Sequence, residues 1–192
     1  LSTNPINEVI NNSLIKEESQ KLNFGADTFD LISLINPLSK ELNVLRKTML
    51  FGGLSNIEYN INRQNKDILL YEFGNIYSKK NESFQESEKL AIWITGRFQK
   101  HSWNTNDIFT DFFYLKSIIE KILFKMDLEN KYNIEVINSN FSNQSIVYKV
   151  NNQSVINLLK LNKDLLKFSG IKQDVYYACL LYTSPSPRDQ LQ

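Results

Sequence analysis

The sequence is poor in the residues that carry most redox, metal and hydrolytic chemistry. Its 192 residues include one cysteine, Cys179, and one histidine, His101. A single cysteine excludes an internal disulfide and a thiolate metal cluster. A lone histidine in a loop gives little support for a hydrolytic triad or a zinc site, and neither common glycine-rich phosphate loop occurs. We therefore expect no catalytic residues and no metal-binding residues in this chain.

Long apolar runs and an excess of one charge are also missing. No apolar stretch approaches the ~20 residues of a membrane span, and the first residues lack the basic-then-apolar pattern of a signal peptide. Lysine and arginine total 22 against 21 aspartates and glutamates, a formal net charge of +1. This balance gives no support for an electrostatic nucleic-acid or membrane surface. We expect a cytoplasmic protein without a membrane partner.

The sequence does contain enough apolar residues for a core. Hydrophobic residues make up 42% and aromatic residues 12% of the chain, and its length suits one domain. The stretches 67–77 and 90–98 are rich in strand-forming residues, and the second is nearly apolar throughout, which is typical of a strand covered on both faces. Between them, the charged segment 78–89 is predicted to be a hairpin loop. Further strands are predicted at 7–15, 29–37, 132–138, 145–150, 154–159 and 174–178.

Two long helices and two short ones are also predicted. The first long helix is expected to begin at Asn43 as its N-cap. Its apolar residues recur at steps of three and four: Leu45, Met49, Leu50, Leu54, Ile57 and Ile61. The second spans 108–126, with the stripe Ile108, Phe112, Leu115, Ile119, Ile122 and Met126. Short helices are predicted at 16–22 and 163–168, the latter ending at Gly170, and "VNNQS" at 150–154 predicts a tight hairpin turn. This order predicts an α+β fold with a largely antiparallel sheet flanked by helices.

Adjacent glycines interrupt the first long helix. Gly52 and Gly53 each cost about 1 kcal/mol relative to alanine in a helix interior. A close approach by another backbone would explain that cost, and a break between two short helices is the alternative.

Six polar residues stand out from the apolar pattern: Arg46, Asn60 and Arg63 on the first helix, Glu72 in the first apolar strand, and Asp111 and Lys116 at the start of the second helix. Glu72 is the least expected, because a carboxylate in an apolar strand needs a partner. We expect an Arg–Glu pair that ties the helix to the strand, with a substrate contact as the alternative. A buried pair of this kind fixes orientation more than it adds stability.

The end of the chain has a different character. From Cys179 it reads "CLLYTSPSPRDQLQ", with Pro185 and Pro187 flanking a serine and no apolar period. We expect a folded domain over 1–178 and a disordered tail over 179–192. The tail resembles translated vector or adapter sequence, so we expect the natural protein to continue differently after about Ala178.

Two segments carry a family resemblance. The segments "LRKTMLFGGLSNIEYNINRQ" and "LLYEFGNIY" closely resemble the pattern of the bacterial phenylalanyl-tRNA synthetase beta subunit. The matching residues are Arg46, Gly52, Asn60, Arg63, Glu72 and Gly74. A second match is to the family's tryptophan followed by Asp-Phe-x-x-Leu-Lys-Gly, here Trp103, Asp111, Phe112, Leu115 and Lys116. The resemblance covers about 7–178, and the sequence departs from the family at Phe51, Gly53 and Ser117.

The resemblance implies a domain similar to a class II aminoacyl-tRNA synthetase core that does not itself activate an amino acid. Class II catalysis uses an arginine on the strand of its second signature motif to hold ATP phosphates, and Ser78 stands where that arginine is expected. The implied role is to pack against the catalytic alpha subunit. The residues expected to fix the structure or the interface are Arg46, Gly52, Asn60, Arg63, Glu72, Gly74, Asp111 and Lys116. We expect Gly52 to face the partner, because Leu50, Leu54 and Ile57 already fill the core stripe, and packing against its own sheet is the alternative.

The resemblance also implies a larger assembly. The complete enzyme is an alpha2beta2 tetramer that esterifies phenylalanine to its tRNA(Phe) with ATP and magnesium, and we expect neither cofactor in this fragment. Two alternatives stay open. One is a free-standing binding module on the same fold. The other is a self-sufficient class II ligase, which would require an arginine near Ser78 that points into an ATP-sized pocket.

Overall fold

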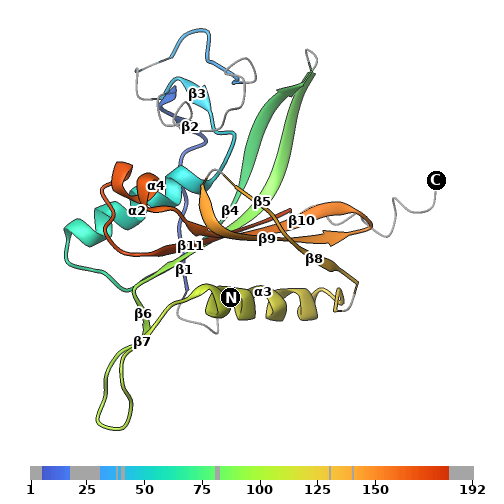
Figure 1. The fold of residues 1–192 in the computed structure, drawn as a ribbon. Coiled ribbons are helices and arrows are strands. Elements are labelled where there is room, and N and C mark those ends of the chain that lie inside the picture. The colour runs from blue at the N-terminus through green and yellow to red at the C-terminus, as the bar shows by residue number, and fades with distance from the viewer. Residues whose placement is uncertain are drawn as a thin grey trace.

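The computed structural model describes residues 6–17, 31–37, 39, 42–80, 83–129, 131–139 and 141–181. The elements are labelled as in Figure 1. In chain order they are β1 (Asn7–Glu8), β2 (Leu14–Ile15), β3 (Val44–Leu45), α2 (Leu50–Asn62), β4 (Ile68–Lys80), β5 (Ser83–Thr95), β6 (Arg97–Gln99), β7 (Ile108–Phe109), α3 (Phe112–Lys125), β8 (Asn133–Val136), β9 (Ser142–Val150), β10 (Gln153–Leu161), α4 (Lys163–Phe168) and β11 (Val175–Leu181).

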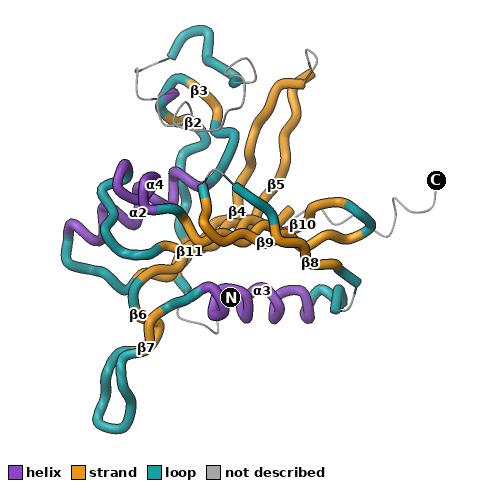
Figure 2. Tube along the Cα trace, in the orientation of Figure 1, coloured by secondary structure: helices purple, strands orange, loops and turns teal. Residues whose placement is uncertain are grey.

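One large sheet organises the molecule. Its seven strands run in the order β1-β4-β5-β11-β10-β9-β8. Only β1 is parallel to its neighbour, β4, and the other pairs are antiparallel. Figure 2 shows the helices on either side of these strands. The predicted α+β fold with a largely antiparallel sheet flanked by helices is therefore confirmed.

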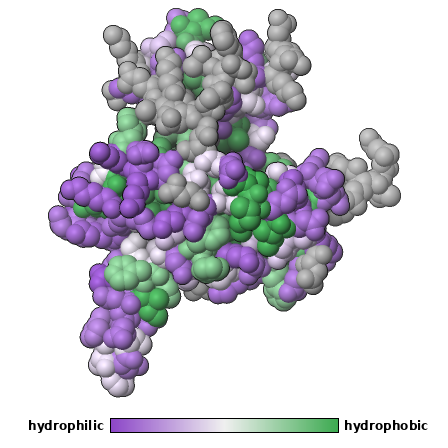
Figure 3. Space-filling model, viewed as in Figure 1, coloured by the Kyte–Doolittle hydropathy of each residue, from purple (hydrophilic) through white to green (hydrophobic). Residues whose placement is uncertain are grey.

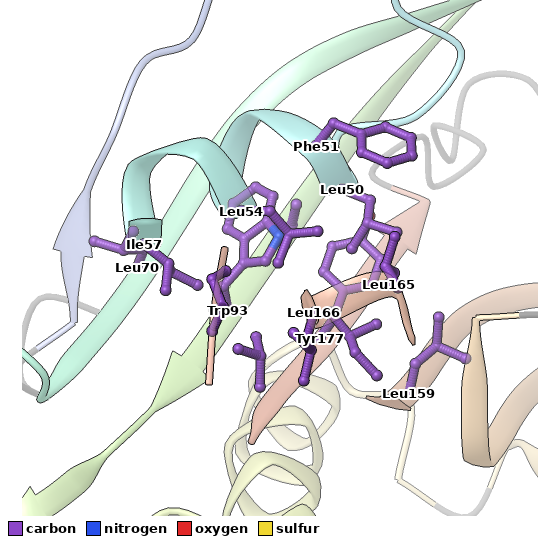
Figure 4. Close-up of a cluster of buried hydrophobic side chains, with 14 of the residues drawn as sticks. Leu50, Phe51, Leu54, Ile57, Leu70, Trp93, Leu159, Leu165, Leu166 and Tyr177 are labelled. Carbon is purple, nitrogen blue, oxygen red and sulfur yellow. The ribbon is translucent and has the colours of Figure 1, made fainter. Parts of the chain in front are cut away.

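The sheet separates two apolar cores. On one face, α2 and α4 cover a cluster around Trp93 and Tyr177, and Figure 4 shows Leu54 of α2 against the indole. On the other face, α3 covers a second cluster around Ile92 and Tyr148. Strand β5 serves both cores, since residues 90–95 are all buried. The sequence predicted such a strand, and the prediction is confirmed.

The segment predicted as a charged loop at 78–89 is instead a long hairpin. Strands β4 and β5 pair without interruption from Ile68 opposite Thr95 to Lys80 opposite Ser83. Strand β11 accompanies β5 only as far as Lys89, so the distal part of the hairpin stands free of the sheet (Figure 1). The loop prediction was wrong because polar residues also pair across strands when both partners are exposed, as Asn75 and Glu86 do with a 2.5 Å hydrogen bond.

The first long helix begins later than predicted. Val44 and Leu45 form β3, which pairs with Leu14 and Ile15 of β2, and α2 begins at Leu50 with Met49 as its N-cap. Asn43 is not a cap. Its side chain instead accepts a hydrogen bond from the backbone of Glu17 at 3.1 Å. The helix then runs unbroken through both glycines, so the alternative of two short helices is wrong.

Other strand and helix boundaries also differ between the prediction and the structure. The predicted strand 7–15 is two separate pairs, β1 and β2, which join different sheets. In the described part of 29–37 there is only an isolated bridge from Ser33 to Val44. Helix α3 begins at Phe112, because Ile108 and Phe109 pair with β6 as β7. Most of the short helix predicted at 16–22 lies outside the described residues.

Local turn chemistry behaves as predicted at two places. Asn151 and Asn152 both have positive φ, 49° and 63°, which is the conformation of a tight turn between antiparallel strands. Helix α4 spans the predicted residues, with Asn162 accepting a hydrogen bond from Leu165 N at 2.8 Å. Gly170 follows it with φ of 69°, where a residue with a Cβ would be strained.

The last strand continues past the expected end of the domain. Cys179, Leu180 and Leu181 belong to β11 and pair with β5. Leu180 is only 4% exposed, so the prediction that nothing from Cys179 onward could pack is wrong for these three residues. Residues 182–192 lie outside the described residues, and their vector origin stays a prediction.

Candidate functional site

A buried ion pair joins the loop before α2 to strand β4. Nη1 of Arg46 lies 2.7 Å from Oε1 of Glu72, and the two side chains are 4% and 1% exposed. The sequence predicted such a pair for Glu72. It placed Arg46 on the helix, which is incorrect, because this residue lies between β3 and α2.

Both partners of this pair make further hydrogen bonds. Arg46 Nε donates to the carbonyl of Asn75 at 2.8 Å. Asn11 donates to Glu72 through its side-chain amide at 2.7 Å and its backbone N–H at 3.3 Å, and its own oxygen accepts from Asn56 of α2 at 2.9 Å. The pair is therefore the centre of a polar cluster that ties the N-terminal segment, α2 and β4 together. Sequence reasoning missed Asn11, which carries no local signal for this role.

Gly74 makes room for the guanidinium. A Cβ at this position would lie 2.1 Å from Arg46 Nη2, so any larger residue would displace the arginine. Three of the matched family residues, Arg46, Glu72 and Gly74, thus form one structural unit.

The two helix glycines face different neighbours. A Cβ on Gly53 would lie 2.1 Å from Cε2 of Trp93, whereas one on Gly52 would lie 3.1 Å from Cγ of Asn11. The tight approach is therefore at Gly53, against an indole ring and not against another backbone. Gly52 lies beside Asn11 of its own chain, and its contact with a partner chain stays a prediction.

Asn60 and Arg63 form the C-terminal end of α2. The Asn60 side chain donates to Asn56 O at 2.8 Å, and the backbone carbonyl of Asn60 accepts from the backbone N–H groups of Arg63 and Asn65, each at 3.0 Å. The Arg63 guanidinium lies 3.4 Å from the ring centroid of Tyr59. Both side chains support the helix end locally, and an interface role for them stays a prediction.

Asp111 and Lys116 act on α3. Asp111 Oδ1 accepts a 2.6 Å hydrogen bond from Tyr114 N, which makes Asp111 the N-cap. Lys116 pairs with Glu120 one turn later at 3.4 Å. These contacts explain both residues within the chain, and their interface role also stays a prediction.

Residues 97–109, here called the arm, form the β6–β7 hairpin that projects from the sheet (Figure 1). At its root, Arg97 lies 2.8 Å from Asp67 and 3.2 Å from Asp107. The Arg97 hydrogen bonds hold the pKa of Asp67 below its usual value. For Asp107, the backbone N–H of His101 lowers the pKa most, followed by Arg97. These ion pairs brace the arm, and sequence reasoning missed them because their partners are up to thirty residues apart.

The arm exposes an aromatic side chain. Trp103 is 95% exposed, and Phe109 at the base of the arm is 65% exposed. Both lie on the same projecting element and are therefore candidates for an interaction surface.

Ser78 lies on β4 opposite Gln85 of β5. A hydroxyl carries no charge, so this position cannot supply the phosphate-binding guanidinium that class II catalysis uses. The residues present therefore do not fit the ATP-binding arginine that the resemblance would place here. Within the described parts of the chain, no group of three or more metal-ligating side chains occurs, and no helix is long and apolar enough to cross a membrane.

The fold is shared with solved structures of an aminoacyl-tRNA synthetase. Two solved structures of pyrrolysyl-tRNA synthetase from Desulfitobacterium hafniense align with 92% of this chain and 60% of theirs, each at a TM-score of 0.66. Their sequence identities are 14% and 13%, so the likeness concerns the fold alone.

Sequence comparison defines the family more narrowly. Residues 1–181 match the family described as "Phenylalanyl tRNA synthetase beta chain CLM domain", and the chain belongs to this family. The phenylalanine–tRNA ligase beta subunit of Bacteroides thetaiotaomicron is 34% identical over 185 residues, covering 91% of this chain and 23% of that protein. The Fusobacterium nucleatum beta subunit is 32% identical over 176 residues, covering 88% and 22%. The chain thus spans about a quarter of the length of these relatives.

Proposed function

We propose that this chain is a structural domain of the beta subunit of a phenylalanine–tRNA ligase, and that it packs against the catalytic alpha subunit. The complete assembly would be a cytoplasmic alpha2beta2 tetramer that charges tRNA(Phe) with phenylalanine. ATP and magnesium would be bound outside this chain. The family membership and the printed names of the relatives support the proposal.

The observation that carries the assembly role is the arm. Its turn exposes Trp103 (95%), and the base of the arm and the first turn of α3 expose three further apolar side chains: Phe113 (75%), Phe109 (65%) and Ile108 (43%). Because ion pairs with Asp67 and Asp107 brace the arm, little order would be lost on docking. A large aromatic anchor on a preorganised element is the typical energetic centre of a protein interface.

Co-purification with the cognate alpha subunit tests this role. Trp103→Ala should weaken the complex by about 2 kcal/mol, roughly thirtyfold in Kd, as for an aromatic anchor. Phe84→Ala is the matched control, because Phe84 is 70% exposed on the β4–β5 hairpin, the other projecting element. Both variants should melt like wild type. If Trp103→Ala binds the alpha subunit as tightly as Phe84→Ala does, the arm is not the docking element.

The chain alone should be catalytically silent. With Ser78 in place of the expected arginine, nothing at that position neutralises phosphate charge during adenylate formation. Phenylalanine-dependent exchange between ATP and pyrophosphate should stay at the level of a buffer control. Turnover well above it would favour the self-sufficient ligase.

A further inference from the structure

Three surface cavities adjoin one another along one flank of the molecule. The first, about 360 Å³, lies along α4 and the turn after it. The second, about 410 Å³, lies at the C-terminal end of α2, and the third, about 500 Å³, lies at the root of the arm. The first and second share Gly170 and Lys172, and the second and third share Lys66 and Gln173. Together they form a continuous depression from α4 to the arm.

Four lysines line this depression, which we call the lysine groove: Lys66, Lys163, Lys167 and Lys172. All four are exposed, and none has an ion-pair partner among the described residues. The acidic residues of the groove wall are already engaged, since Asp67 pairs with Arg97 and Asp174 with Lys160, each at 2.8 Å.

The local charge is therefore positive although the whole chain is nearly neutral. The Asp174 carboxylate raises the pKa of Lys160, which keeps the lysine charged. Two further carboxylates lie near, Glu58 beside Gly170 and Asp164 on α4, and the four lysines outnumber them. Figure 3 shows hydrophilic side chains gathered over the flank that carries α2 and α4.

Aromatic rings accompany the lysines. The two helices that border the groove expose Tyr59 and Phe168, which are 57% and 60% exposed. Arg63 lies flat against the Tyr59 ring, 3.4 Å from its centroid. Lysine ammonium groups contact phosphates as point charges, and neighbouring rings can stack with unpaired bases.

We propose that the lysine groove binds the phosphodiester backbone of RNA. An acidic peptide would satisfy the lysines but would make no use of the exposed rings, so the combination favours a nucleic acid. The choice of RNA rests on the proposed function, because the relatives are named as tRNA ligases. Four unpaired lysines can contact only a few phosphates. The groove would therefore supply part of the affinity for RNA, and other parts of a larger assembly would supply the rest.

The test is fluorescence polarisation of a labelled RNA hairpin with a single-stranded 3′ tail, titrated with the 192-residue chain at about 50 and about 200 mM salt. The groove variant is Lys163→Gln with Lys167→Gln and Lys172→Gln. The matched control is Lys79→Gln with Lys121→Gln and Lys125→Gln, which removes the same charge from β4 and α3. Thermal melts establish that both variants fold.

Wild type and the control variant should bind the RNA with similar affinity. The groove variant should bind roughly tenfold more weakly at the lower salt concentration, and its salt slope should fall by about three, one for each lost phosphate contact. Equal losses in both variants would overturn the proposal, as would the absence of binding by wild type. Displacement of the RNA by polyglutamate as readily as by polyuridine would also overturn it, in favour of an acidic peptide.

The two proposals fail in different ways, because this assay contains no alpha subunit. RNA binding that does not depend on the groove lysines, together with intact co-purification, would refute the groove proposal and leave the assembly role standing. RNA binding through the groove without co-purification would do the reverse.

Discussion

Two arginines of this molecule are held by carboxylates, in opposite surroundings. Arg46 and Glu72 are buried, and a backbone carbonyl and Asn11 complete their hydrogen bonds. Arg97 holds Asp67 and Asp107 at the arm root, where its own side chain is 34% exposed. Water can replace a lost partner at Asp107, which is 36% exposed, and cannot at Glu72, which is 1% exposed. The same ion pair is therefore indispensable in one place and nearly dispensable in the other.

The largest predicted difference in stability comes from neutralising one carboxylate at each of the two ion pairs. Glu72→Gln keeps the shape of the side chain but leaves Arg46 buried without a counter-charge, which should lower the free energy of unfolding by about 3–5 kcal/mol. Asp107→Asn at the exposed site should cost less than about 1 kcal/mol. Urea unfolding of both variants measures the difference, and equal losses would break the comparison.

The next effect concerns the end of β11. A chain that ends at Ala178 loses buried Leu180 and the pairing of three residues with β5, and should be about 3 kcal/mol less stable. A chain that ends at Leu181 should stay within about 0.5 kcal/mol of the full sequence, since the removed stretch has no apolar period. Chemical unfolding of both truncations separates the buried end of the strand from the residues after it. A stable chain ending at Ala178 would contradict the packing of Leu180.

The helix glycines extend the contrast to packing. Gly53→Ala should cost about 1–3 kcal/mol, because its Cβ would overlap a Trp93 ring that the core holds in place. Gly52→Ala should cost less than Gly53→Ala, because its Cβ would lie 3.1 Å from Asn11 and would overlap no ring, and the helix gains about 1 kcal/mol of propensity. The melting temperatures of the two single variants measure which substitution costs more stability. A reversed order would show that Asn11 is the more rigid neighbour.

The smallest effect is a pH dependence at the arm root. The folded-state pKa of Asp67 is lowered by Arg97, so its contribution is present above the ordinary pKa of 3.8 and is lost as pH falls through the lower folded value. Between about pH 6 and pH 3, wild type should lose up to ~1 kcal/mol more stability than Asp67→Asn. Urea midpoints at both pH values measure it. Identical losses would mean that the pair adds nothing to folding.

Much of the fold is predictable because its signals are local. The central apolar strand at 90–98, the Asn151–Asn152 turn and the short helix ended by Gly170 each follow from neighbouring residues. The antiparallel α+β architecture follows from the order of these elements, and the Arg46–Glu72 pair follows from a charge that needs a partner.

The failures share a cause, which is contact between distant segments. Val44 and Leu45 leave the expected helix because β2 pairs with them, and no pattern within the helix reports that strand. The charged hairpin was predicted as a loop because its strands are stabilised by pairing with each other, which the polar sequence of either strand does not reveal. Gly53 is needed because Trp93, forty residues away, packs against it. Leu180 is buried because its strand pairs with β5 and β10.

The two tryptophans give the molecule a built-in optical contrast. Trp93 is fully buried and its indole N–H has no hydrogen-bond partner, whereas Trp103 is 95% exposed. Emission from Trp93 should be blue-shifted and shielded from iodide, and emission from Trp103 should be red-shifted and readily quenched. A partner that covers the arm would therefore shield only the red component, while unfolding would shift only the blue one. Docking and unfolding can be followed separately in one spectrum without an attached dye.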